Sequence, residues 1–195
     1  MRGTIAVEPT LIAALWPAGP RTRFLRLALL AVGGSLLLTL SAKTQVPFWP
    51  VPMTMQTFAV LAIGMAFGPR LGAATVGLYL LEGAFGLPVF AGVEIGLAYM
   101  SGPTGGYLLG MLAAVVLVGH LAGRGWDRSI IGTVAAMVLG NLAIYIPGVL
   151  WLGTLAGFDK ALALGLTPFL LGDALKVALA AFLLPACWSL IGRKG

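Results

Sequence analysis

The chain has 195 residues, of which 59% are hydrophobic and 9% are charged, and its net charge is +6. A soluble domain carries about 25% charged residues, and disordered chains are poor in apolar residues and rich in charge. The composition therefore excludes both classes and indicates an integral membrane protein. Because the apolar segments follow one another with short links, we expect a single membrane domain.

The N-terminal segment differs in composition from the rest. Residues 1–20 are mixed in character, and their one apolar run, residues 11–16, is too short for the core of a signal peptide. We expect residues 1–20 to form a cytoplasmic arm, with an interfacial helix as one form of it. Residues 21–195 then form the membrane domain.

Six apolar segments lie within residues 21–195. A helix that crosses roughly 30 Å of hydrocarbon needs about 20 residues. The second and third segments are short, and Gly68-Pro69-Arg70 between them is typical of a turn that ends one helix and starts the next. We therefore predict an all-α integral membrane fold, a bundle of six transmembrane helices. The expected spans are residues 24–42, 53–67, 71–85, 104–122, 129–151 and 166–191.

The basic residues indicate how the bundle is oriented. With the N-terminus inside the cell, nine lysines and arginines lie on the inner side, and only Lys43 and Lys160 lie in outer loops. Cytoplasmic loops carry such an excess, so both termini are predicted to be cytoplasmic. The net positive charge is thus a topology signal and does not indicate nucleic-acid binding. The nine are Arg2, Arg21, Arg23, Arg26, Arg70, Arg124, Arg128, Arg193 and Lys194.

Two outer loops have an unusual composition. Residues 43–52 contain three prolines and Trp49, which favours a stiff, extended segment. Residues 86–106 are rich in turn-forming residues with apolar side chains between them. Loops of this kind can fold back over a bundle as a lid that closes a binding site.

One pair of ionisable residues lies inside a predicted span. Asp173 and Lys176 are three residues apart, so on a helix they share a face and are about 4.5 Å apart along its axis. Ionisable residues in a span are costly and usually face a bundle interior or a cavity. The pair either fixes helix packing as an internal ion pair or exchanges its contacts for contacts with a ligand. We favour the second interpretation, because a buried pair is weak evidence for stability.

Other candidates lie in the outer loops and on the first span. Glu94 and Lys43 either contribute to a site or are simply solvated, and Trp49, Tyr99 and Tyr107 are the aromatic residues considered for the site. Ala31 and Ser35 on the first span form a small-residue face. That face either packs within the bundle or docks on a partner membrane protein.

Several chemistries lack their motifs. One cysteine and one histidine cannot form a disulfide or a metal-ligand cluster. The chain has neither a phosphate-binding G-x-x-x-x-G-K-[ST] loop nor a G-x-S-x-G nucleophile motif. We therefore expect no enzyme activity, metal or cofactor, and infer a protein that binds or transports a small solute.

Five motifs carry a resemblance to a known family. In this order and spacing they resemble the BioY family, the biotin-specific substrate-binding (S) components of energy-coupling factor (ECF) transporters, over nearly all of residues 24–191. The motifs are PVPMTMQT at 50–57, GPRLG at 68–72, GLPVFAG at 86–92, GPTGGY at 102–107 and GDALK at 172–176.

The resemblance implies a fold, a ligand and partners. It implies a six-helix S component in the cell membrane that captures biotin from outside and couples to a module of one transmembrane T protein and two ATPases. Asp173 and Lys176 match the family's polar contacts to the ligand, and Glu94 lies near the position of a further contact that is often Asn. Docking would use the face with Ala31 and Ser35, which keeps the family's Ala-xxx-Ala pattern only approximately.

The chemistry of biotin agrees with these residues. Its ureido ring has two N–H donors and one carbonyl acceptor, and hydrogen bonds to charged groups are about twice as strong as neutral ones. Our hypothesis is that Asp173 and Lys176 contact the ureido ring while Trp49, Gln56 and Tyr107 line the pocket. In the alternative assignment, Lys176 or Lys43 contacts the ligand carboxylate.

Other functions and assemblies stay open at this stage. The chain could be an S component for another vitamin, a stand-alone transporter, or an intramembrane enzyme with Glu82 or Glu94 beside Asp173 as a weak candidate. It could also act alone, as a homo-oligomer, or only with an energising module.

Overall fold

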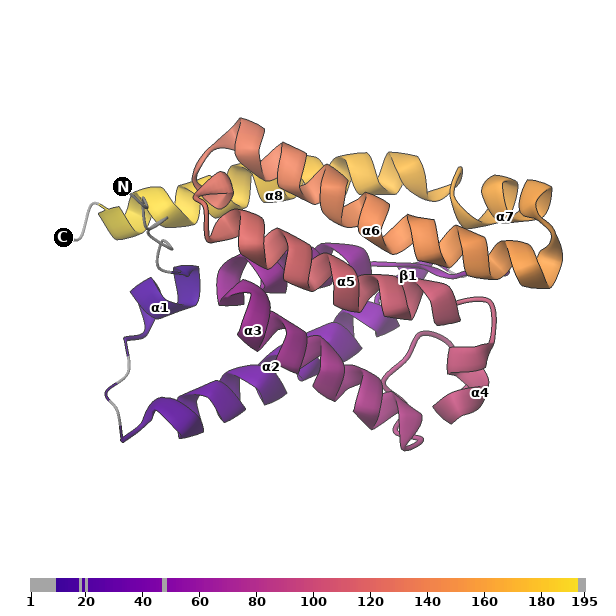
Figure 1. Ribbon diagram of the computed structural model, residues 1–195, viewed down its shortest axis with the longest axis horizontal. Coiled ribbons are helices and arrows are strands. Elements are labelled where there is room, and N and C mark those ends of the chain that lie inside the picture. Colours follow the sequence, from indigo (N-terminus) through magenta and orange to yellow (C-terminus); the bar gives the residue numbers. More distant parts are fainter. Residues whose placement is uncertain (1–9, 18, 20, 47–48, 193–195) are drawn as a thin grey trace, which may run out of the picture.

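The computed structural model describes residues 10–17, 19, 21–46 and 49–192, and these form a helical bundle (Figure 1). The first nine residues of the expected cytoplasmic arm lie outside the described residues. The helices are α1 (Leu11–Leu15), α2 (Arg23–Lys43), α3 (Gln56–Ala84), α4 (Gly96–Ser101), α5 (Gly105–Ala122), α6 (Ile130–Ala156), α7 (Phe158–Gly165) and α8 (Phe169–Gly192), with a 3₁₀ turn η1 (Trp126–Arg128) and a two-stranded hairpin of β1 (Gln45–Val46) and β2 (Met53–Thr54).

Among the described residues, five helices are long and apolar enough to cross a membrane, namely α2, α3, α5, α6 and α8. The predicted all-α membrane fold is thereby confirmed. The expected second and third spans both lie within α3, which is interrupted where the sequence predicts a turn: Gly68 has a non-helical backbone, with φ of 78°. Pro69 follows it and cannot donate a backbone hydrogen bond.

The two halves of α3 fold back on each other at Gly68. A continuous helix would separate Gln56 from Tyr79 by about 35 Å, whereas the Gln56 Nε2 donates a hydrogen bond to the Tyr79 hydroxyl at 2.8 Å. Gly64 and Gly72, on opposite sides of the turn, also lie in contact. The expected second and third spans thus correspond to the two halves of this hairpin, whereas five helices among the described residues are long enough to cross a membrane.

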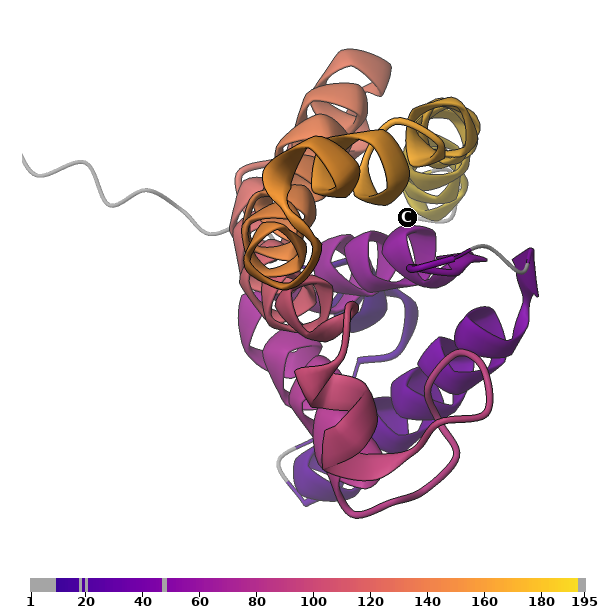
Figure 2. The same cartoon turned by 90° about the vertical axis from the view of Figure 1, so that its right-hand side faces the viewer.

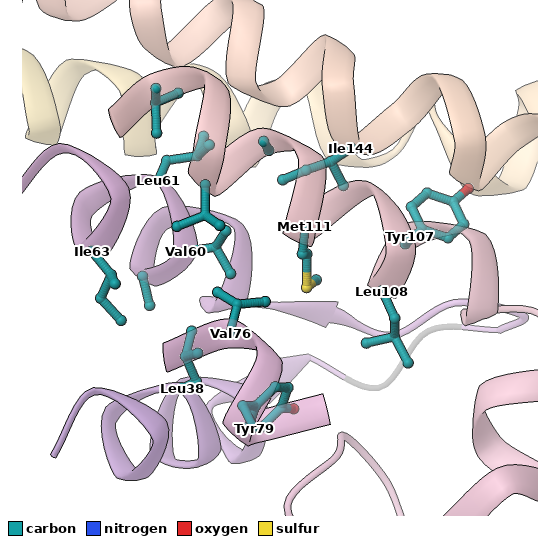
Figure 3. Packing of buried hydrophobic residues seen from close by; sticks show 14 of the residues in the cluster. Leu38, Val60, Leu61, Ile63, Val76, Tyr79, Tyr107, Leu108, Met111 and Ile144 are labelled. Atoms are coloured by element: carbon teal, nitrogen blue, oxygen red, sulfur yellow. The ribbon is translucent and has the colours of Figure 1, made fainter. Parts of the chain in front are cut away.

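Helix α5 forms the centre of the bundle, between α3 on one side and α6 on the other. Small residues allow these close approaches: a Cβ at Gly110 would lie 2.7 Å from the carbonyl oxygen of Ile144 on α6. Figure 3 shows Met111 of α5 directed toward Val76 of α3 within the buried core. Helices α2 and α8 flank the core at opposite edges, as the end view shows (Figure 2).

The flanking helices expose large aliphatic side chains. On α2 these include Leu29, Leu36 and Leu40, and on α8 they include Leu171 and Leu175. In water such surfaces would be unfavourable, but lipid tails are as apolar as leucine. The pattern fits a multi-pass membrane protein, in which the lipid-facing surface is apolar and carries few charged residues.

The two ends of the bundle differ in charge. The α3 turn with Arg70, the η1 loop with Arg128, the helix α1 and the end of α8 lie at one end, and α4 and α7 lie at the other (Figure 1). This arrangement agrees with the sidedness that the basic residues predict. Helix α1 occupies the expected apolar run and is tied to α2, because the Arg26 Nη2 donates to the carbonyl oxygen of Ile12 at 2.9 Å.

Candidate ligand-binding site

The polar centre of the bundle is a buried cluster built on α8. Asp173 and Lys176 are 5% and 9% exposed, and the Lys176 Nζ lies 2.9 Å from the Asp173 Oδ1. The Lys176 Nζ also donates to the Thr57 Oγ1 at 2.9 Å, and the Thr57 hydroxyl lies 3.3 Å from the Asp173 Oδ1 as a donor. The Tyr145 hydroxyl donates to the Asp173 Oδ2.

Three membrane helices bring this cluster together. Helical spacing places Asp173 and Lys176 on one face of α8, Thr57 stands in the first turn of α3, and Tyr145 lies within α6. A buried charge is tolerated only when it is paired and hydrogen-bonded, and here the pair has two further partners. The predicted ion pair is therefore present, and both of its members are hydrogen-bonded.

The cluster retains unused hydrogen-bonding capacity. An ammonium has three donors and each carboxylate oxygen accepts about two hydrogen bonds. Lys176 uses two donors, to Asp173 and Thr57, and the Asp173 Oδ2 accepts from Tyr145. A ligand can thus add one acceptor beside Lys176 and one donor beside the Asp173 Oδ2 without breaking the ion pair.

An inner cavity opens beside Lys176 toward the outer end of the bundle. Its volume of about 40 Å³ suffices for a few water molecules, so a larger ligand requires side chains or loops to move. The cavity is polar at Lys176 and Thr57 and apolar or aromatic over most of its wall. The lining residues are Val51, Pro52, Thr54, Gln56, Thr57, Tyr99, Thr104, Tyr107, Leu108, Met111, Ile144, Tyr145, Phe169 and Lys176.

A wider outer pocket of about 320 Å³ lies above the inner cavity, between the two outer loops. Trp49, Gly92 and Glu94 line it, and it shares Pro52, Tyr99 and Thr104 with the inner cavity. Burial raises the pKa of the Tyr99 hydroxyl above its usual 10, so this side chain is neutral at physiological pH. Pro52, Tyr99 and Thr104 line both spaces, so the outer pocket lies directly next to the inner cavity.

The outer loop that follows α3 is anchored from two sides. The Lys43 Nζ donates to the carbonyl oxygens of Phe90 and Gly92 at 2.7 and 3.3 Å. The Phe90 ring stacks on Tyr99 at 4.8 Å between centroids and packs edge-on against Tyr79 at 5.4 Å. Residues of both outer loops, Val51 and Pro52 of the first and Tyr99 and Thr104 of the second, line the inner cavity, and their action as a lid stays a prediction.

A third space lies between α6 and α8 on the outside of the bundle. This groove has a volume of about 730 Å³ and an almost wholly apolar lining, apart from Asn141, Tyr145 and Asp173. Tyr145 also lines the inner cavity. The hydrogen bond from Tyr145 to Asp173 thus forms part of the wall between the inner cavity and the groove.

The structure separates the predicted site residues into three groups. Asp173, Lys176, Gln56 and Tyr107 lie at the inner cavity or its polar cluster, which brings together segments far apart in the sequence. Trp49, 77% exposed, and Glu94 line the outer pocket instead. Lys43 lines neither space and holds the outer loop through backbone carbonyls.

Two residues of the polar cluster were not predicted. Thr57 directly follows Gln56 at the end of the PVPMTMQT segment, and its place in that segment was the available signal. Tyr145 lies far from either end of its span, where an aromatic belt gives no reason for a hydroxyl. Asn141, one helical turn before it, marks the same face of α6 as polar.

The small-residue face on α2 differs from the prediction at one residue. Ser35 is 1% exposed and donates a hydrogen bond to the Glu82 carboxylate on α3. It therefore points into the bundle and not toward a partner. Ala31 is half-buried on the same helix, and its part in docking stays a prediction.

Comparison with known proteins gives the chain a family. The profile of the BioY family matches residues 16–193. A probable biotin transporter BioY from Pyrococcus horikoshii is 40% identical over 144 residues, which are 74% of this chain and 85% of the relative. The biotin transporter BioY from Rhizobium etli is 36% identical over 171 residues, 83% of this chain and 91% of the relative.

The chain belongs to the BioY family. Its fold also matches the crystal structure of the S-component for biotin from an ECF-type ABC transporter, with a TM-score of 0.76 over 88% of this chain and 95% of that one, at 23% identity. This similarity confirms the predicted S-component fold. The BioY match begins at residue 16, so α1 lies before the shared region.

Proposed function

We propose that this BioY protein is the biotin-binding S component of an ECF-type transporter and serves in biotin uptake. The observation that carries the proposal is the buried Asp173–Lys176 pair, 2.9 Å apart and placed beside the inner cavity. The relatives named biotin transporters support the ligand. The chain is a transporter subunit in this proposal, and no catalytic role is assigned to any residue.

The ureido ring of biotin suits the unused capacity of the polar cluster. One ring N–H would donate to the Asp173 Oδ2, and the ring carbonyl would accept from Lys176. The apolar thioether ring would lie against Tyr107, Met111 and Phe169, which line the same cavity. With the head inside, the valerate chain would extend past Pro52, Tyr99 and Thr104 into the outer pocket.

The carboxylate end of the ligand would lie nearer the outer loops. The outer pocket is lined by Gly92, and Lys43 holds the Gly92 carbonyl at 3.3 Å. Lys43 is therefore the basic residue placed to attract a carboxylate in that pocket, while the exposed Glu94 would repel it. This assignment gives Lys176 to the ureido carbonyl and Lys43 to the far end of the ligand.

Energy for transport would come from partners. An ECF module with a transmembrane T component and two ATPase subunits would dock on the membrane face of the bundle, and Ala31 of α2 remains the proposed contact. Co-purification after mild solubilisation tests this, because tagged chain expressed with such a module should retain the other subunits. Homo-oligomers and transport without a module are the alternatives, and counterflow in liposomes that lack ATPases would support the latter.

Binding of labelled biotin to the purified protein tests the ligand and its orientation. Asp173→Asn should weaken biotin binding about 10- to 100-fold, since a hydrogen bond to a charged group contributes about 1.5–3 kcal/mol. Glu94→Gln, an exposed change in the outer pocket, is the control and should bind biotin at least as well as the wild type.

Biotin methyl ester separates the two orientations. If Asp173→Asn binds biotin normally while esterification abolishes binding to the wild type, the ureido ring does not contact Asp173. If the wild type binds no biotin but binds another vitamin, the chain is an S component of different specificity.

A further inference from the structure

We propose that Tyr79 is a positioning residue for ligand recognition: it orients the Gln56 carboxamide so that the Oε1 is presented to the ligand as an acceptor. This inference rests on the proposed function. Gln56 lines the inner cavity, whereas Tyr79 does not line it and acts through Gln56. The chemical group that would be recognised is the second N–H of a cyclic urea, beyond the one placed at Asp173.

The orientation of the amide follows from counting donors. The Tyr79 hydroxyl has one proton, and it lies 3.2 Å from the carbonyl oxygen of Val89, which can only accept. The hydroxyl must therefore accept from Gln56, whose Nε2 is 2.8 Å away. A flipped amide could accept the hydroxyl proton only if the Val89 carbonyl lost its hydrogen bond, so keeping both bonds selects one of the two amide orientations.

The Gln56 Oε1 keeps spare acceptor capacity. It accepts one long hydrogen bond, from the Thr54 hydroxyl at 3.4 Å. Because an amide oxygen has two lone pairs, it can accept another. Gln56 is 4% exposed, so a lone pair buried beside the cavity gains from a donor that a ligand supplies. The outer wall of the cavity thus offers an acceptor in addition to Asp173.

The same network connects the site to an outer loop. Val89 belongs to the loop that Phe90 and Lys43 hold in place. Tyr79 itself is 1% exposed and packs edge-on against Phe90. Gly83 provides the space, because a Cβ there would lie 2.0 Å from the Phe90 ring. The orientation of Gln56 therefore depends on the loop being seated over the bundle.

The test compares biotin with its two ring N-methyl isomers, N1′-methylbiotin and N3′-methylbiotin. Dissociation constants are measured by calorimetry for the wild type, Tyr79→Phe, Gln56→Met and the double variant. In the wild type both isomers should bind more weakly than biotin. In Tyr79→Phe the preference for biotin should fall about tenfold against one isomer and stay unchanged against the other.

The variants distinguish positioning from a structural role. Gln56→Met removes the amide but keeps the Tyr79–Val89 hydrogen bond, so it should lose the same preference, and the double variant should lose no more. Trp151→Phe is the matched control, since it removes a side-chain hydrogen bond to an outer-loop carbonyl, that of Gly102 at 2.9 Å, and neither residue lines the inner cavity or the outer pocket. It should keep both preferences.

The inference is overturned if Tyr79→Phe weakens all three ligands equally, if both preferences survive in Gln56→Met, or if the two substitutions act additively. Melting temperatures show whether each variant is folded. Should Tyr79→Phe fail to fold, Gln56→Met alone decides the outcome. A wild type that binds no biotin contradicts the proposed function instead, so the two failures are separate.

Discussion

At the scale of single residues, the site depends on the partners of one carboxylate. Asp173 accepts hydrogen bonds from Lys176, Thr57 and Tyr145, which come from three helices. Replacing one member of a buried charged pair leaves the other unpaired, which is strongly destabilising. A donor on the periphery of the pair is the more informative residue to change, because its loss leaves the pair intact.

Tyr145→Phe should weaken biotin binding roughly tenfold, since hydrogen bonds to charged groups contribute about 1.5–3 kcal/mol and Asp173 would turn more freely. Calorimetry on the purified protein measures the change. Tyr107→Phe removes a hydroxyl that donates at 2.8 Å to the Gly165 carbonyl, away from Asp173, and should have the smaller effect on affinity. An affinity equal to wild type in Tyr145→Phe would show that its hydroxyl does not support Asp173.

Lys43→Met removes the hydrogen bonds that hold the Phe90 and Gly92 carbonyls. We expect faster association and faster dissociation of biotin, because the outer loop would open more often. Stopped-flow fluorescence would measure both rates. An association rate equal to that of the wild type would show that the loop held by Lys43 does not limit entry of the ligand.

At the scale of elements, the α3 hairpin places Gln56 beside Tyr79 and so creates one wall of the cavity. The turn depends on Gly68, whose φ of 78° and ψ of 175° lie in a region essentially confined to glycine, which costs other residues roughly 1–3 kcal/mol. A side chain at this position would also meet a steric clash, because a Cβ would lie 2.7 Å from the Cγ2 of Thr10, just before α1. The turn and α1 are thus packed together.

Gly68→Ala should lower the free energy of unfolding by about 1–3 kcal/mol through backbone strain and contact with Thr10. Gly77→Ala is the matched control, since a Cβ there meets nothing within 4 Å and alanine is favoured in helices by about 1 kcal/mol. Thermal unfolding of both variants in the same detergent measures the difference. Equal melting temperatures would argue against strain at Gly68.

At the scale of the whole molecule, orientation in the membrane follows from charge at the bundle ends. Arg124 and Lys160 are both exposed but lie at opposite ends of α6. The excess of basic residues assigns the Arg124 end to the cytoplasm. The candidate site then opens to the outside, because the outer pocket lies at the Lys160 end with α4.

Cysteine labelling in intact cells tests this orientation. In a Cys187→Ser background, Lys160→Cys should react with a membrane-impermeant maleimide, and Arg124→Cys should react only after permeabilisation. The opposite pattern would place the binding site on the cytoplasmic side and would exclude capture of the ligand from outside.

Much of this protein follows from the sequence alone. Hydropathy determines the membrane class and the approximate spans, because a helix in lipid satisfies its own backbone hydrogen bonds, and the position of the basic residues predicts the orientation. The turn at Gly68-Pro69 and the shared face of Asp173 and Lys176 are likewise local, since both depend on backbone geometry over a few residues.

Only the tertiary structure determined what surrounds these groups. Three findings depend on contacts between residues that are 28 to 119 positions apart in the sequence. Thr57 and Tyr145 complete the polar cluster, Ser35 faces Glu82, and Lys43 holds an outer loop. Among apolar helices, lateral packing is selected by small residues and close contacts that leave no periodic pattern in the sequence. The sequence therefore identified the charged pair, and the packing of the helices selected its partners.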